Sequence, residues 1–502
     1  PPSRSNAIRQ KQNDYFQANR RETLSQKVQN ARVAAESSVD LASTDLLLTH
    51  LQNYVNEQLK RHIVEWLAQP AYLEHINDYL EAIKCDSVAQ NHFGIIQLRK
   101  LLTKHYDTLI QYIIDHECLH RIIEFSQQEA HAHLVLEAAW CLTNLALGDT
   151  SQTRFLVQKD IIAIFLKVSQ SVYPQIAEQG IWGIGNICGD SVDNRAAVLA
   201  HHSVPALCEV YRRGHPVLCK YIVWVFSLIC KFRPKRESPT TTAVPLSVIV
   251  DFVLKHNSLR AEEIEDCITG ASGLISAETL GYFDSAAFIG KLCSYYKVVS
   301  PHSTAHKEGI QCAHHLIGML FALKGSHIDE FFTQGLLEQL CHNLQVLSAR
   351  SVRKELCWIL SNIASGEPTH VKALCSSPQL IEMLLSLAAD ADVDLSYEAL
   401  YAVQNLCKCK KAKVLSDLLQ KPLFALFEKA ARTGPLQRQI VALEGAEGVL
   451  DFYHRSNVWN QVVQKAKAEG FVKTLETLQL APDLELYFKS NAMVYKYFDI
   501  AN

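Results

Sequence analysis

Aromatic residues recur along this sequence at an almost constant interval, and this interval restricts the possible folds more than any other feature. Trp140, Trp182 and Trp224 are each 42 residues apart. The positions that continue the series, at intervals of 45, 46, 43 and 43 residues, are Thr269, His315, Trp358 and Tyr401. Each lies near the middle of a segment with helical apolar periodicity. Such a constant interval indicates an array of structural repeats.

A period of about 42 residues is the size of an armadillo or HEAT unit, in which two or three helices stack on their neighbours. The 20 glycines and 15 prolines are few for 502 residues, which suits helices joined by short turns. One further unit fits around Leu98, before the first tryptophan. We therefore predict an all-α fold: a right-handed α-solenoid of about ten armadillo repeats over residues 79–502, with the last repeat at about 467–502.

Charge, hydropathy and cysteine usage narrow the class of protein. The net charge of -3 gives no overall basic field, so we expect no direct binding to nucleic acid. The most apolar stretches, such as 221–230, are about half as long as a membrane span, and the start of the chain does not resemble a signal peptide. The 15 cysteines are mostly single and lie in apolar helical runs, which suits a reducing compartment. We therefore expect a soluble intracellular protein without a membrane partner.

An asparagine follows several of the periodic tryptophans four residues later. The pairs are Trp140 with Asn144, Trp182 with Asn186, and Trp358 with Asn362. Residues at i and i+4 share one helix face, so stacked repeats would align these pairs into a ladder. The indoles would form slots for lysine stems, and the carboxamides would bond to a peptide backbone. The alternative is that each tryptophan is ordinary helix core, but a buried unpaired carboxamide one turn later would be costly.

The segments that carry this pattern resemble importin-α, the family of armadillo adaptors that carry proteins with basic nuclear localisation signals into the nucleus. The segments are EAAWCLTN at 137–144, EQGIWGIGNICGD at 178–190 and KELCWILSNIASG at 354–366. The resemblance extends over nearly the whole chain. It implies a protein of the cytoplasm and nucleus whose partners are cargo proteins, the carrier importin-β and an export receptor.

The resemblance implies a major signal-binding site and a lysine pocket within it. The residues of the major site are Trp140, Asn144, Gly148, Thr153, Gln179, Trp182, Asn186, Asp190 and Trp224. In the pocket, one cargo lysine would be held by the Asp190 carboxylate, the Thr153 hydroxyl and the Gly148 carbonyl. A desolvated ammonium needs a carboxylate and further acceptors, so these groups are chemically adequate. The alternative for Asp190 is an ordinary aspartate at a helix end or turn.

A minor site is implied by the same resemblance. Its residues are Trp358, Asn362, Glu398, Tyr401 and Asn405. Tyrosine replaces a tryptophan there and offers a weaker ring face to a cation. The chain also departs from the family pattern at Leu228, Thr269, Gly273, His315 and Met319. We therefore expect a shortened major site and a narrower range of cargo than is typical of the family.

The two ends of the chain resemble the family's contacts with its carriers. Residues 1–33 hold seven basic and two acidic residues and resemble the importin-β-binding segment, although a solvated tail is the alternative. The implied carrier-binding residues are Arg9, Lys11, Arg20, Arg21 and Lys27. We expect residues 34–78 to be a helical linker. The last repeat resembles the region that meets the export receptor; the alternative, which is compatible with that contact, is a capping helix pair that shields the final core.

Motifs of catalysis are missing from the sequence. We find no P-loop, dinucleotide fingerprint, G-x-S-x-G elbow or His-Glu-x-x-His, so we predict no enzyme, cofactor or metal site. The neighbouring histidines His131 with His133, and His314 with His315, lack a Cys-x-x-Cys partner and are expected to be ordinary. Two functions remain: a nuclear import adaptor, or a scaffold of the same fold whose divergent groove clamps one constitutive partner without a transport role.

Overall fold

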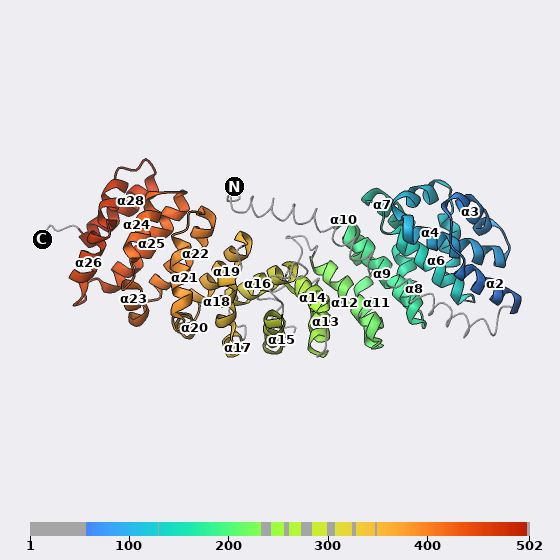
Figure 1. Ribbon diagram of the computed structural model, residues 1–502, viewed down its shortest axis with the longest axis horizontal. Helices are drawn as coiled ribbons and strands as arrows, with labels where there is room; N and C mark the ends of the chain where they lie inside the picture. The colour runs from blue at the N-terminus through green and yellow to red at the C-terminus, as the bar shows by residue number, and fades with distance from the viewer. Residues whose placement is uncertain are drawn as a thin grey trace. The chain divides into compact units, whose positions relative to one another are not determined.

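The computed structural model describes the chain in eight ranges, and every regular element in them is a helix (Figure 1). The ranges are 57–128, 130–231, 242–255, 261–272, 284–298, 307–323, 328–346 and 349–498. The all-α fold predicted from the sequence is confirmed. The predicted carrier-binding segment 1–33 lies outside these ranges, as do residues 34–56 of the predicted linker, Gly273 and the side chain of Thr269.

The chain divides into two compact units, one ending at Phe252 and one beginning at Val253. The helices of unit 1 are α2 (Glu57–Ala68), the 3-10 turn η1 (Leu73–His75), α3 (Ile76–Lys84), α4 (Val88–Asp115), α5 (Leu119–Phe125), α6 (Ala132–Leu145), α7 (Thr150–Gln158), α8 (Ile161–Ser169), α9 (Pro174–Asp190), α10 (Val192–Ala200), α11 (Ser203–Arg212) and α12 (Pro216–Lys231). Helix α13 (Ala243–Lys255) runs across the division.

Unit 2 continues the same pattern of short and long helices. Its elements are α14 (Ala261–Ser272), α15 (Ser285–Val298), α16 (Lys307–Ala322), α17 (Asp329–Thr333), α18 (Leu336–Val346), α19 (Arg350–Ala364), α20 (Pro368–Cys375), α21 (Pro378–Ala388), α22 (Val393–Lys408), α23 (Ala412–Leu419), α24 (Leu423–Arg432), α25 (Leu436–Tyr453), α26 (Trp459–Ala468), α27 (Phe471–Leu478), α28 (Leu484–Met493) and the π-helical turn η5 (Val494–Phe498).

A complete repeat consists of two short helices and one long helix. Helices α7, α8 and α9 have 9, 9 and 17 residues, and α10, α11 and α12 have 9, 10 and 16. The long helices of successive repeats pack side by side, as α4, α6, α9 and α12 in unit 1 and as α14, α16, α19, α22 and α25 in unit 2. We call these the ladder helices. They carry all the tryptophan and asparagine positions predicted to form the groove.

The turns between helices are defined by local backbone chemistry. Asp149 caps α7 by accepting hydrogen bonds from the amides of Ser151 and Gln152, and the Gln152 side chain accepts one from the Asp149 amide. Asp160 and His202 adopt left-handed φ angles of 59° and 54° just before α8 and α11, at the same place in two successive repeats. The repeat is therefore reproduced in the turns as well as in the helices.

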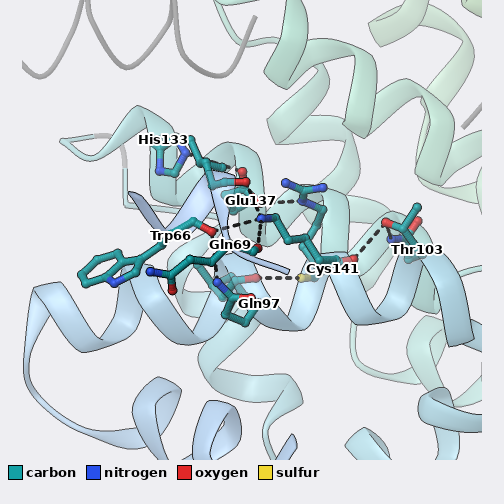
Figure 2. A network of polar contacts seen from close by, with 12 residues as sticks. Trp66, Gln69, Gln97, Thr103, His133, Glu137 and Cys141 are labelled. Carbon is teal, nitrogen blue, oxygen red and sulfur yellow. Dashed lines mark hydrogen bonds and ion pairs between the residues drawn. The ribbon is translucent and has the colours of Figure 1, made fainter. Parts of the chain in front are cut away.

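Helix α2, the first described helix of unit 1, packs on α4. Ile63 and Leu67 form a buried cluster with Ile96. The Lys100 ammonium donates hydrogen bonds to the carbonyls of Trp66 (3.0 Å), Leu67 and Gln69 (2.8 Å), which belong to the carboxyl end of α2 or follow it (Figure 2). A cation there satisfies carbonyls that have no partner within the helix. The described part of the predicted linker thus contains α2, η1 and the start of α3, and its helix α2 is docked on α4.

A buried ion pair joins the first two ladder helices. Arg99 Nε donates to Glu137 Oε2 at 2.8 Å, and both side chains are completely buried. Burial alone would raise the pKa of Glu137, but the Arg99 guanidinium and the nearby His133 ring outweigh it and lower the pKa to about 2. The Arg99 guanidinium also lies 4.4 Å from the centre of the Trp140 ring. The carboxylate is therefore charged and paired inside the protein.

None of the helices in the eight described ranges combines the length and apolarity needed to cross a membrane. All fifteen cysteines are free thiols, and only Cys85, Cys375 and Cys409 are partly exposed. This agrees with the interpretation of the cysteines as small apolar residues within helical runs.

Breaking the Arg99–Glu137 pair should destabilise unit 1. The Arg99→Ala variant leaves a buried carboxylate without its partner, which costs about 3–5 kcal/mol of unfolding free energy. The double variant Arg99→Leu with Glu137→Leu should lose much less stability, because neither charge remains buried. Urea unfolding followed by circular dichroism measures both variants. Equal losses in the single and double variants would show that packing, not charge, dominates at this position.

Candidate peptide-binding groove

Asparagine side chains hold successive ladder helices together. Three of the predicted asparagines donate the side-chain amide to a backbone carbonyl of the preceding ladder helix. The distances are 3.0 Å from Asn186 to Thr143 O, 2.8 Å from Asn362 to Gly318 O and 3.1 Å from Asn405 to Ser361 O. Within the described ranges, the carbonyl oxygens of these three side chains accept no hydrogen bond. Each carboxamide is thus fixed in orientation and keeps an acceptor for a ligand.

The first predicted pair lies in a different environment. Trp140 is only 2% exposed, and Arg99 covers one face of its ring. Asn144 is fully buried, and its amide donates to Thr103 Oγ1 at 3.3 Å. Its carbonyl oxygen has no partner within the described residues. The structure therefore places this pair in the packing between α4 and α6 rather than on an open surface.

Two other tryptophans of unit 1 pack across neighbouring ladder helices. Trp182 is 7% exposed and meets the Tyr221 ring edge to face, with ring centres 5.1 Å apart. Trp224 is half-buried against α9, where a Cβ added to Gly185 would lie 2.0 Å from its ring. Only glycine permits this approach. Gln179 is buried on α9, and its side-chain oxygen has no partner in the described part of the chain.

In unit 2 the aromatic side chains of the predicted groove pack across ladder helices in the same way, but they are more exposed to solvent. Trp358 is half-buried, and its ring contacts Gly318, where an added Cβ would lie 2.1 Å away. His315 stacks on the Trp358 ring at 5.5 Å, with the planes 20° apart. Tyr401 on the next ladder helix is 42% exposed. His315 departs from the family pattern, yet here it contributes a ring beside the tryptophan.

The acceptors of the predicted lysine pocket lie around the turn between α6 and α7. Asp190, the last residue of α9, accepts hydrogen bonds from the Thr150 hydroxyl at 3.0 Å and from Asn194 at 2.7 Å. The buried Thr153 hydroxyl donates to the carbonyl oxygens of Asp149 (2.9 Å) and Gly148 (3.2 Å). The structure thus brings the Asp190 carboxylate next to the start of α7, the helix that carries Thr153.

Known proteins resemble this chain in sequence and in structure. It is 24% identical to importin subunit alpha-5 of Arabidopsis thaliana over 505 aligned positions, which cover 94% of this chain and 93% of the relative. It is 31% identical to importin subunit alpha-1b of Oryza sativa subsp. japonica over 164 residues, or 32% of this chain and 31% of the relative. That alignment spans about a third of the rice protein's length. No protein-family model matches the chain.

This chain is a divergent, importin-α-like armadillo protein. A solved engineered protein has the same fold with a TM-score of 0.68 at 15% identity, and it covers 84% of this chain and 98% of its own length. The predicted armadillo solenoid is therefore confirmed. Neither comparison points to a catalytic family.

Two carboxylates of the importin-α-like chain lie beside the aromatic positions. Burial raises the pKa of Glu178 on α9 to about 7, and a hydrogen bond from Tyr221 only partly opposes this. Glu398 is half-buried on α22, and its charge adds to the effect of burial in raising the pKa of Cys357 on α19. Both carboxylates are placed where a ligand cation would gain from them.

Two glycines that contribute to the candidate site were not identified from the sequence. Gly185 and Gly318 lie under the tryptophan rings of the next ladder helix, 39 residues before Trp224 and 40 residues before Trp358. A glycine inside a helical pattern, one repeat before a tryptophan, was the available signal.

Of the departures from the family pattern, Leu228 is buried and Met319 half-buried. Within the ranges described, no three His, Cys, Asp or Glu residues gather as metal ligands.

Filling the space under Trp358 should displace its ring. The Gly318→Ala variant forces the indole away from α16, and overpacking of this kind costs about 1–3 kcal/mol. Gly290→Ala is the matched control in unit 2, because nothing lies within 4 Å of its added Cβ. It should stabilise the helix by about 0.5–1 kcal/mol. Thermal unfolding and the indole NMR signal report both effects, and equal shifts in the two variants would contradict the proposed contact.

The raised pKa of Glu178 predicts a pH-dependent stability. Its pKa is about 7 in the folded protein against an ordinary value near 4.5. The folded state therefore binds more protons than the unfolded state between these pH values, and stability falls as pH rises through this window. In Glu178→Gln the fall between pH 5 and 8 should be smaller by about 1–3 kcal/mol. Urea unfolding at several pH values tests this, with the exposed Glu209→Gln as control; an unchanged pH profile in Glu178→Gln would contradict it.

Proposed function

We propose that this importin-α-like protein is a nuclear import adaptor. It binds extended, basic localisation signals of cargo proteins along its ladder helices and couples them to importin-β. The observation that carries the proposal is the repeated asparagine arrangement, in which Asn186, Asn362 and Asn405 are each fixed by the preceding helix and keep a free acceptor. The names of the relatives, all importin alpha subunits, support it.

The spacing of the ladder suits an extended peptide. Packed helices lie about 8–10 Å apart. An extended chain rises about 3.3 Å per residue, so about three peptide residues span one repeat. The carboxamides of Asn362 and Asn405, on the neighbouring ladder helices α19 and α22, can therefore bond to the peptide backbone about three residues apart without reading its sequence. The protein groups beside the asparagines then determine which peptide side chains are favoured between these points.

Charge and aromatic rings select basic side chains. Around the α6–α7 turn, Asp190, Thr153 and Gly148 offer a carboxylate, a hydroxyl and a carbonyl oxygen to one lysine. Glu398 in unit 2 adds negative charge next to the Tyr401 ring. Glu178 lies next to Trp182 in unit 1, and its pKa of about 7 leaves it partly ionised near neutral pH. A lysine or arginine stem can pack on such rings while its charge meets a carboxylate.

Coupling to carriers is assigned to the two ends of the chain. In this proposal, Arg9, Lys11, Arg20, Arg21 and Lys27 bind importin-β, and the last repeat binds the export receptor that returns the adaptor to the cytoplasm. Exposed aromatic side chains near the second end support the latter. Phe488 is 64% exposed and Tyr495 is 80% exposed. Such rings are enriched at protein interfaces. The protein would thus move between cytoplasm and nucleus.

A scaffold that clamps one constitutive partner is the second candidate. The burial of Trp140 and Asn144 favours it, because one of the predicted peptide contacts is replaced by an internal one. A groove shortened in this way would accept fewer ligands than one with every position open. A scaffold would have no need for the basic segment at 1–33.

A lysine-rich peptide should distinguish the groove from other acidic surfaces. Asp190→Lys removes the pocket carboxylate and adds a like charge, so affinity for a fluorescent lysine-rich peptide should fall at least about tenfold, or 1.4 kcal/mol. Asp193→Lys is the matched control, because Asp193 is exposed on α10 three residues away. Fluorescence anisotropy measures both. If the two variants lose affinity equally, the lysine pocket in unit 1 is rejected.

Binding to importin-β separates the adaptor from the scaffold. The full chain should retain importin-β in a pull-down, and removal of residues 1–33 should abolish retention without changing peptide affinity. The interaction should weaken steeply with salt, because summed charge attraction drives it. A full chain that binds the lysine-rich peptide but not importin-β would favour the scaffold.

A further inference from the structure

Unit 2 contains a recess at the carboxyl ends of two ladder helices, α19 and α22. Its volume is about 250 Å³. Its lining includes Gly366, Val371, Asn405, Lys408, Cys409 and Lys411. Asn405 also belongs to the groove, so the recess continues the surface on which a peptide would lie. Nothing in the sequence interpretation or the proposed function assigns a ligand to it.

The recess is the counterpart in unit 2 of the lysine pocket in unit 1. Gly148 follows Asn144 by four residues, and Gly366 follows Asn362 by four. The two glycine amides make the same turn, each donating to a carbonyl three residues back at 3.1 Å. Counted from the same asparagines, Thr153 corresponds to Val371.

The carboxylate of the lysine pocket also has no counterpart in the recess of unit 2. Asp190 stands four residues after Asn186, and Cys409 stands four residues after Asn405. Burial raises the pKa of the Cys409 thiol, so the group is neutral near pH 7. Together with the change from threonine to Val371, this removes the carboxylate and the hydroxyl that would hold an ammonium. Only the glycine carbonyl of the original trio is kept.

Two ammonium groups line the recess in place of the lost acceptors. Lys408 donates to Glu444 Oε2 at 2.7 Å, which neutralises part of its charge. Lys411 is exposed and forms no ion pair within the described residues. The local charge is therefore opposite in sign to that of the unit 1 pocket, where Asp190 supplies the charge.

Two helices begin beside the recess, and neither has a side-chain cap. The N-cap residue of α20 is Glu367 and that of α23 is Lys411, and neither side chain accepts a hydrogen bond from its helix. In unit 1 the equivalent helix α7 is closed by the Asp149 capping box. The first residue of α20 is Pro368, which has no N–H, and the His370 amide donates to the Glu367 carbonyl, so α20 contributes mainly its dipole. The first amides of α23 and the dipoles of both helices favour an anion at these ends. This adds to the effect of the lysines.

We propose that the recess of unit 2 binds an anionic side chain, the carboxylate or phosphate of a peptide that lies in the groove. The ligand of unit 2 thus carries an acidic or phosphorylated residue at the position where the ligand of unit 1 carries lysine. The recess has room for about eight waters, at about 30 Å³ each, which is ample for a phosphoserine side chain. The peptide itself rests on the proposed function, whereas the charge preference of the recess does not.

The charge preference can be measured without any peptide, because Cys409 lines the recess and is partly exposed. The full chain is treated with a negatively charged (sulfonatoethyl) or a positively charged (trimethylammonioethyl) methanethiosulfonate, and mass spectrometry follows each cysteine. The anionic-to-cationic rate ratio at Cys409 should exceed that at the partly exposed Cys85 by at least about threefold, and Lys411→Glu should reverse it. Equal ratios at the two cysteines, unchanged by Lys411→Glu, would overturn the proposal.

A positional-scanning peptide library tests whether the anionic group belongs to a bound peptide. The library offers lysine, glutamate or phosphoserine at each position. One position should prefer glutamate or phosphoserine over lysine by about fivefold, and the stronger of the two identifies the group. Lys411→Glu should invert this preference, and Lys413→Glu on the exposed side of α23 should not. A library profile that Lys411→Glu leaves unchanged would overturn the proposal. If no peptide binds, the anionic group does not come from a peptide, and the adaptor function is rejected as well. The labelling rates at Cys409 would still decide the charge preference of the recess.

Discussion

The hydrogen bond from an asparagine amide to the backbone of the preceding ladder helix sets the geometry of the groove. A helical carbonyl has two lone pairs and accepts at most one bond within its helix, so a lone pair remains to be offered. Asn186, Asn362 and Asn405 use that lone pair, so each side chain is held at both its base and its tip. The same contact therefore joins the repeats and orients the acceptor that we propose for ligand binding, so neither role can be altered alone.

The periodic features of the molecule could be predicted from the sequence because they depend on spacing along one chain. The repeat length and the shared face of Trp358 and Asn362 follow from periods of about 42 and 3.6 residues. The burial of Trp140 could not be predicted in this way. It depends on Arg99, which lies on another helix and pairs with Glu137 across the interface. Periodicity shows which residues share a face but not what covers it.

The two units show how one backbone arrangement can serve opposite chemistries. The turn around Gly148 and the turn around Gly366 have the same amide bond, and an asparagine precedes each by four residues. The difference lies in two side chains, Asp190 against Cys409 and Thr153 against Val371, and in the added Lys411. Because the backbone is held by the repeat, a change of ligand charge needs no change of fold.

Helix α2 limits how far the described part of unit 1 can be shortened. Lys100 is only 9% exposed, and it donates hydrogen bonds to three carbonyls at the end of α2 or just beyond it. A version that starts after Gln69 would remove these three acceptors from a buried ammonium and would uncover Ile96. Linear arrays open most easily at their ends. A recombinant fragment of unit 1 should therefore begin at or before Glu57, even though the repeats themselves start later.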